Sequence, residues 1–144
     1  MIIGKEAMSV TVKSFFLLSL LVLVQPSTSI SFGPDARVTV IVENELQGGQ
    51  DLLMHCVSAD DDLGVKLIHP NTSYQWKFHI NVFGKTLYHC GFKWASVLHK
   101  FVIYETRRDH SLCHICSWVI KEDGPCLVFD EKSDCYSWNS LEER

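Results

Sequence analysis

The sequence predicts an all-β protein: a small antiparallel β-sandwich of about eight strands, disulfide-stabilised and preceded by a cleaved signal peptide. Three observations support this prediction. Apolar residues recur with a period of two rather than 3.6, which is typical of strands. Turn-forming residues separate the apolar runs at short intervals. Six cysteines are many for a chain of 144 residues, and small exported domains commonly carry such a number.

The N-terminal segment, residues 1–29, has the layout of a secretory signal peptide. Lys5 and Lys13 precede an unbroken apolar run at 15–24, and Pro26 and small residues end it. A run of about ten residues is half of the ~20 that a membrane-spanning helix needs, so a membrane anchor is the less favoured interpretation. We therefore expect cleavage after Ser29, a secreted, extracellular protein without membrane insertion, and one domain over residues 30–144.

The clearest predicted strand is 74–80, where Tyr74, Trp76, Phe78 and Ile80 fall on one face and polar residues on the other. Similar alternation predicts strands at 37–42, 52–58, 86–94, 100–105, 113–121, 126–129 and 134–138. Turn signals rich in Gly, Pro, Asn and Asp separate them at 47–49, 60–64, 70–73, 83–85 and 122–125. No helix of three turns is expected, so the elements predict a sandwich or barrel.

The composition excludes several classes of protein. A hydrophobic fraction of 47%, a charged fraction of 21% and a net charge of −4 describe a packed globule rather than a disordered tail. An acidic chain does not bind the phosphates of nucleic acid by charge, so we expect no nucleic-acid partner.

The cysteines are interpreted as three structural disulfides rather than a metal site or a nucleophile. Cys113 and Cys116 lie in the predicted strand 113–121, where residues three apart point to opposite faces, so the two cannot share an ion or a mutual bond. We expect these two to bridge to Cys56 and Cys90, in an order that the sequence does not fix. The remaining cysteines are close in sequence and are expected to close a local loop, Cys126 with Cys135.

No catalytic or metal-binding motif stands out, and we expect no cofactor and no metal. The seven histidines are scattered singly. The Asp60-Asp61-Asp62 run with Gly64 holds only fragments of a calcium loop and is better interpreted as a solvated turn. Two alternatives remain open. A secreted hydrolase or toxin would show a concave pocket that gathers two or more histidines with an acid, and a carbohydrate-binding module would show an exposed aromatic platform.

One modification site is predicted. Asn71, Thr72 and Ser73 form an N-glycosylation acceptor directly after Pro70, in a predicted turn of a secreted chain. We therefore expect a glycan at Asn71.

Five motifs in order carry a resemblance to a known family. They are HCVSADDDLG at 55–64, HCGFKW at 89–94, YETRRD at 104–109, CHICSWVI at 113–120 and DGPC at 123–126. With this spacing, from about Val38 to Trp138, the chain resembles the plant self-incompatibility protein S1 family, also called S-protein homologues. Four cysteines match the disulfide cysteines of that family, namely Cys56, Cys90, Cys113 and Cys116, and Trp94 and Trp118 look like core residues.

The resemblance implies a small secreted β-sandwich without catalytic activity. It also implies a signalling ligand for a transmembrane receptor on a target plant cell, in self-pollen rejection or related cell–cell signalling. Loops at the ends of a sandwich usually form such a surface. Our candidate receptor contacts are the charged residues of two loops: Asp60, Asp61, Asp62, Arg107, Arg108, Asp109 and His110. The alternative is that both loops only solubilise the protein, or that Arg107 or Asp109 pins its loop internally.

Overall fold

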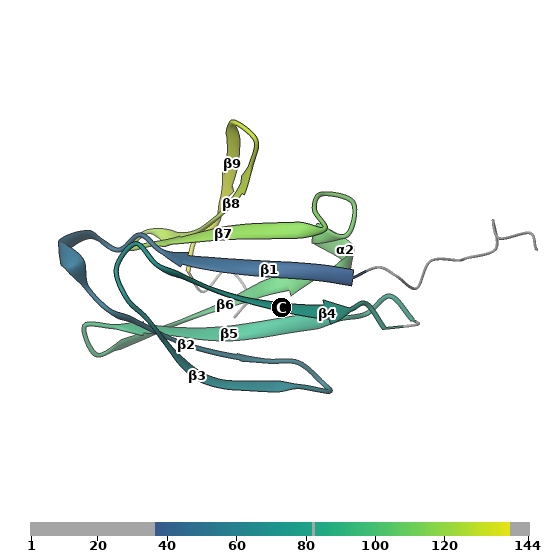
Figure 1. Cartoon of the computed structure of the whole chain (residues 1–144), viewed down its shortest axis with the longest axis horizontal. Helices are drawn as coiled ribbons and strands as arrows, with labels where there is room; N and C mark the ends of the chain where they lie inside the picture. The colour runs from purple at the N-terminus through teal and green to yellow at the C-terminus, as the bar shows by residue number, and fades with distance from the viewer. Residues whose placement is uncertain (1–36, 82, 139–144) are drawn as a thin grey trace, which may run out of the picture. The chain divides into compact units, whose positions relative to one another are not determined.

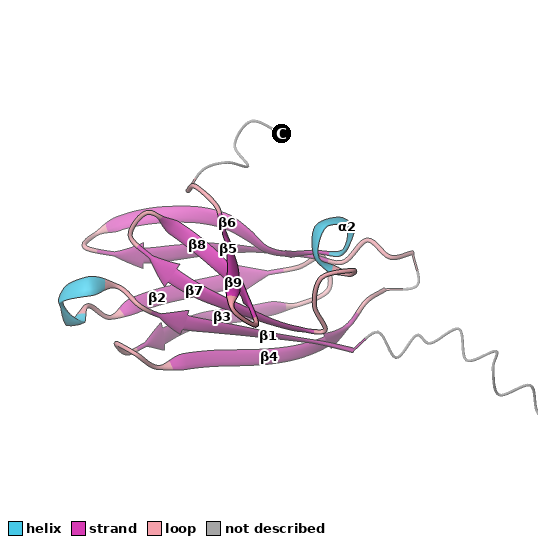
Figure 2. Ribbon diagram, turned by 90° about the horizontal axis from the view of Figure 1, so that it is seen from above, coloured by secondary structure: helices cyan, strands magenta, loops and turns pink. Residues whose placement is uncertain are grey.

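A computed structural model describes residues 37–81 and 83–138 of the chain, so the predicted signal peptide and its cleavage site lie outside the described residues (Figure 1). Nine strands form two sheets within this range. A five-stranded sheet has the order β4-β1-β7-β8-β9, and a four-stranded sheet has the order β3-β2-β5-β6 (Figures 1 and 2). The prediction of an all-β sandwich is confirmed.

The five-stranded sheet consists of β1 (Arg37–Asn44), β4 (Ser73–His79), β7 (Ile115–Lys121), β8 (Gly124–Phe129) and β9 (Lys132–Cys135). The four-stranded sheet consists of β2 (Leu52–Val57), β3 (Asp62–Ile68), β5 (Leu87–Trp94) and β6 (Val97–Glu105). Neighbouring strands are antiparallel except β1 and β7, which are parallel. Two short helical segments, η2 (Gln47–Gly49) and α2 (Thr106–Asp109), lie in connections.

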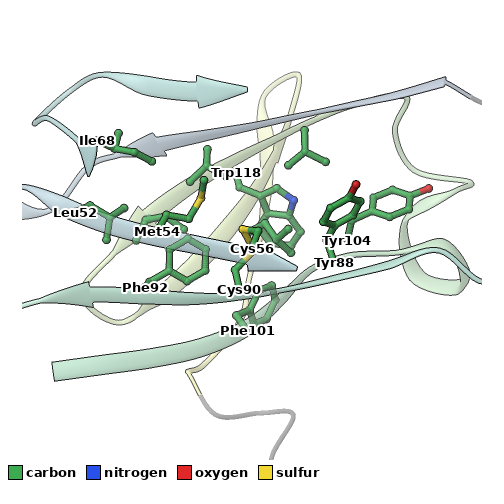
Figure 3. Close-up of a cluster of buried hydrophobic side chains, with 14 of the residues drawn as sticks. Leu52, Met54, Cys56, Ile68, Tyr88, Cys90, Phe92, Phe101, Tyr104 and Trp118 are labelled. Carbon is green, nitrogen blue, oxygen red and sulfur yellow. A yellow bond between two sulfur atoms is a disulfide. The ribbon is translucent and has the colours of Figure 1, made fainter. Parts of the chain in front are cut away.

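The core lies between the two sheets, where the inward positions of the strands meet. Val38, Val40 and Val42 of β1 are fully buried, as the alternation predicts. The large side chains of the four-stranded sheet, such as Phe92 and Phe101, pack toward Trp118 of β7 (Figure 3). The predicted apolar face of β4 also turns inward and joins this core.

Two predicted elements differ from the structure. The segment predicted as a turn at 60–64 overlaps a strand that the prediction lacks, because β3 begins at Asp62 and pairs with β2. The apolar residues Val65 and Leu67 of this strand face solvent, while Lys66 Nζ lies 5.3 Å from the centroid of the Tyr74 ring. The apolar positions of β3 therefore do not identify its buried face. The strand predicted at 134–138 is instead β9, which ends at Cys135.

The chain beyond β9 packs back onto the core. Gly124 has φ +147°, and a Cβ at this position would overlap the carbonyl oxygen of Tyr136, so only glycine allows this close approach. The Tyr136 N–H donates to the Pro125 carbonyl at 2.9 Å. This contact places the Tyr136 ring against Trp118 and Phe101, with centroids 5.8 and 5.4 Å away.

The three disulfides correct one prediction and confirm another. Cys56 bonds to Cys90, its direct partner across β2 and β5, and Cys126 bonds to Cys135 across β8 and β9, as expected. Cys113 bonds to Cys116, so the prediction that these two cannot pair was wrong, as was their bridging to Cys56 and Cys90. The reason is that β7 begins only at Ile115, so Cys113 precedes the strand and is not held to its alternation.

Candidate recognition surfaces

Three connections meet at one end of the sandwich, which we call the loop end: residues 58–61 before β3, residues 80, 81 and 83–86 before β5, and residues 106–114 before β7. Thr86 and Thr106 join the second and third connections, because each backbone N–H donates to the other residue, over 3.1 Å in both cases. A pocket of about 310 Å³ between the first two is lined by Asp60 and Lys85, among others. The two predicted charged loops therefore lie at the same end, as the β2–β3 connection and α2 show (Figure 1).

The three aspartates before and at the start of β3 have different surroundings. Asp60 is exposed, and the Asp61 carboxylate accepts a hydrogen bond from the Tyr88 hydroxyl at 3.4 Å. Asp62 Oδ1 accepts from the Gly64 N–H at 2.8 Å and contacts His55 Nε2 at 2.6 Å. The Gly64 N–H and the His55 ring hold the pKa of the Asp62 carboxyl below its usual value. All three remain accessible to a partner.

Arg108 and Asp109 form a buried ion pair in the connection before β7. Arg108 donates from Nε and Nη2 to the two carboxylate oxygens of Asp109, at 2.7 and 2.8 Å. Arg108 also donates to the Val102 carbonyl, and the Glu105 N–H donates to Asp109 at 2.9 Å. The Asp109 side chain is fully buried and that of Arg108 is 18% exposed.

Three aromatic rings complete the surroundings of Arg108. The guanidinium lies 5.2 Å from the ring centroids of Phe101 and Trp118 and 5.3 Å from that of Tyr136, within the range of cation–π attraction. Burial, together with the charge of Asp109, raises the pKa of the nearby Tyr104 hydroxyl to about 12.

This geometry corrects the assignment of Arg108 and Asp109 as receptor contacts. A carboxylate that no solvent reaches cannot meet a receptor, so these residues pin the connection internally. Arg107 and His110 on either side are exposed and remain available. The alternative that Arg107 pins the loop internally is not supported, because its side chain is exposed.

The predicted glycosylation site lies at the opposite end of the sandwich. Asn71 is exposed in the turn between β3 and β4, with φ 56°, and its N–H donates to the Asn44 carbonyl at the end of β1. The loop end lies instead beside the start of β1, where the Thr39 N–H donates to the His114 carbonyl. A glycan at Asn71 would therefore leave the loop end uncovered.

A groove that the sequence analysis missed runs over the outer face of the four-stranded sheet. It encloses about 710 Å³, and its lining is mainly apolar, with His55, His89, Lys93 and Lys100 among the polar residues. Outward-facing residues of neighbouring strands line the groove. The only trace of it in the sequence is therefore apolar residues at strand positions that should face solvent. Its lining gathers two histidines, and the Asp62 carboxylate beside it contacts His55, so this groove comes near the criterion set for an enzyme.

The other criterion, an aromatic platform for carbohydrate, is not met by the residues that the structure describes. Trp76 is 7% exposed, and Tyr74 and Phe78 pack against the core. Phe83 is the single aromatic among the exposed large apolar side chains in this part of the chain. Across 37–81 and 83–138, no group of three metal-ligating side chains occurs and no helix is long and apolar enough to span a membrane.

Fold and surfaces together define a small, disulfide-bonded β-sandwich with charged loops gathered at one end. The model of the plant self-incompatibility protein S1 family matches residues 39–138, and the chain belongs to this family. S-protein homolog 5 of Arabidopsis thaliana is 40% identical over 105 residues, covering 73% of this chain and 81% of that protein. S-protein homolog 29 of the same plant is 35% identical over 130 residues, covering 88% and 96%.

A solved structure shares the fold. It is described as one of the SPH, or self-incompatibility protein homologue, proteins, a widespread family of small, highly stable, secreted proteins from plants. The match has a TM-score of 0.54 at 19% identity and covers 72% of this chain and 96% of that one. The predicted family and fold are confirmed. The predicted secretion agrees with this description and with three disulfides, which persist in oxidising compartments.

Proposed function

We propose that this chain is a secreted, non-enzymatic signalling ligand that a transmembrane receptor on a target plant cell recognises at the loop end. The observation that carries the proposal is the meeting of three connections that expose charges of both signs, Asp60, Lys85 and Arg107, with His110 exposed beside them. Such charges set partner choice and association rate more than bulk affinity, which suits a signal that must be specific.

The scaffold beneath these charges supports the proposal. The buried Arg108–Asp109 pair and the Thr86–Thr106 hydrogen bonds hold the connections in one arrangement before any partner binds. A preorganised loop loses less conformational entropy on binding than a free one. Placement of the predicted glycan at the far end also leaves the loop end free.

The test is a matched pair of charge-reversal variants. We expect Asp60→Lys with Arg107→Glu to reduce saturable binding of the labelled, oxidised protein to plant protoplasts by about tenfold or more. Asp123→Lys with Lys121→Glu makes the same exchange of charge in the exposed turn between β7 and β8, at the opposite end, and should bind as the unchanged protein does. Equal binding by both variants would refute recognition at the loop end.

A second candidate function, hydrolysis, has one specific observation in its favour. His55 Nε2 lies 2.6 Å from Asp62 Oδ1 in the outer groove, and His89 lines the same groove, an arrangement that general acid–base catalysis could use. Against it, the His55 and Asp62 side chains are 44% and 62% exposed, and most of the lining is apolar.

Turnover assays separate the two functions. Under the ligand proposal, cleavage of RNA and cell-wall polysaccharides stays at background for both the native protein and His55→Gln. Cleavage that His55→Gln abolishes, and that the exposed His79→Gln control retains, would establish an enzyme instead.

A further inference from the structure

We propose that the outer face of the four-stranded sheet is a second recognition surface, which takes a protein segment carrying apolar side chains together with carboxylates. We call this surface the outer groove. It is separate from the loop end, because its lining comes from the faces of β2, β3, β5 and β6 rather than from the connections.

The strand register aligns the outward residues of this sheet face, on which the groove lies, in rows across the sheet. One row runs from β3 to β6 through directly paired residues: Leu67, Leu53, Lys93 and Leu98. The next row is parallel to it: Val65, His55, Gly91 and Lys100. Leu53, Leu67, Leu98 and Val65 are 39%, 53%, 55% and 65% exposed, so solvent meets a contiguous apolar face. Faces of this kind mark interaction sites.

Gly91 gives this face its hollow. It has no side chain at the position where its row neighbours His55 and Lys100 project outward. A Cβ at Gly91 would lie 3.0 Å from Leu98 Cδ1, so the Leu98 side chain leans over the space that the glycine leaves. The four strands span roughly 14 Å at the usual strand spacing, which suits a segment of about four extended residues.

The charges on the groove identify the chemistry of its occupant. Lys93 and Lys100 are exposed in the lining, and no carboxylate belongs to that lining. Asp62 stands beside it, but its Oδ1 is already engaged by His55 and the Gly64 N–H. The chain as a whole has a net charge of −4, so the groove is a locally basic site on an acidic protein. Carboxylates flanking apolar side chains complement it.

The same charges argue against other occupants. A second copy placed face to face would bring Lys93 and Lys100 near their own equivalents, and like charges in an interface are unfavourable. Two lysines in an acidic protein are also too few to bind the phosphates of nucleic acid.

The experiment selects ligands from a random short-peptide library displayed on phage, with the oxidised secreted protein as bait. We expect enriched peptides to combine Leu, Ile, Val or Phe with Asp or Glu. Lys93→Glu with Lys100→Glu should weaken their binding by about tenfold or more. The control Lys77→Glu with Lys132→Glu reverses two exposed lysines of the five-stranded sheet and should leave binding unchanged.

A second variant tests the hollow itself. Gly91→Val keeps a good strand former at this position and needs only the exposed end of Leu98 to move, so we expect an unchanged unfolding midpoint but about tenfold weaker peptide binding. The lysine variant carries the test alone if Gly91→Val does not fold.

Several results would overturn the proposal: no enrichment, enrichment of basic peptides, or peptide binding that neither groove variant weakens. Binding to phosphatidylglycerol vesicles without acidic peptide ligands would assign the groove to a membrane surface, and a dimer that Gly91→Val abolishes would assign it to a second copy. The loop-end variant Asp60→Lys with Arg107→Glu should keep its peptide affinity, so failure of one surface is distinguishable from failure of the other.

Discussion

Replacing Asp109 by alanine should be the most damaging single change in the connection before β7. The substitution removes the acceptor of three hydrogen bonds, two from Arg108 and one from the Glu105 N–H. Breaking a buried ion pair by removing one partner costs about 3–5 kcal/mol, because the remaining charge is left buried. Arg108 is 18% exposed and recovers some hydration, so we expect the lower end, about 3 kcal/mol.

Urea unfolding followed by tryptophan fluorescence measures this loss directly, since Trp118 lies against the guanidinium. For a domain of about 100 residues, 3 kcal/mol corresponds to a fall in Tm of about 12 °C or more. The matched control is Asp123→Ala in the exposed turn between β7 and β8, which should stay within about 0.5 kcal/mol of the unchanged protein. A loss below about 1 kcal/mol for Asp109→Ala would refute the assignment of a buried, structural ion pair.

Three further predictions concern the disulfides, a tyrosine and the glycan. Replacing Cys56 and Cys90 by alanines should cost about 4 kcal/mol in urea unfolding, against about 2 kcal/mol for Cys113 and Cys116, because the sequence separations of the two disulfides are 34 and 3. The reverse order would contradict the chain-entropy argument. Folding raises the pKa of Tyr104 from 10.0 to about 12, so the contribution of the protonated hydroxyl to the free energy of unfolding is complete below pH 10 and is lost from pH 10 to 12. In an absorbance titration Tyr104→Phe should remove this late ionisation. An unchanged titration curve would argue against the burial of Tyr104. Ser73→Ala should abolish the glycan without altering the left-handed backbone of Asn71. The variant should run as a faster band on a gel and bind protoplasts as the unchanged protein does. Reduced binding would show that the glycan takes part in recognition.

The strand predicted most directly from the sequence has one buried and one exposed face. In 74–80 the large rings alternate with polar residues, and the structure buries that face against the core. β3 was missed because Val65 and Leu67 face solvent while Lys66 turns inward, which inverts the expected pattern. An edge strand whose outer face forms a groove has no reason to show the usual alternation.

The position of the charged loops was predictable from the sequence, but the surroundings of their individual residues were not. Charge runs in turns indicated where the loop end lies, as the Asp60 turn shows. The sequence does not distinguish Arg107 from Arg108, because the rings that surround the Arg108 guanidinium lie elsewhere in the chain, at Phe101, Trp118 and Tyr136. The Cys113–Cys116 bond was missed for a related reason: its geometry depends on where β7 begins, and boundaries of elements are less specified by sequence than the elements themselves.

Under the proposed function, the position of Arg108 separates stability from recognition at the loop end. Its guanidinium lies over Phe101 of the four-stranded sheet and Trp118 of the five-stranded sheet, so one side chain links both layers at this end. Arg107 and His110 point into solvent on either side and contribute little to folding. Exposed charges can therefore change partner choice without loss of the scaffold, whereas a change at Arg108 removes both. Two neighbouring arginines should consequently give opposite results: Arg107→Glu lowers receptor binding at constant Tm, and Arg108→Ala lowers Tm first.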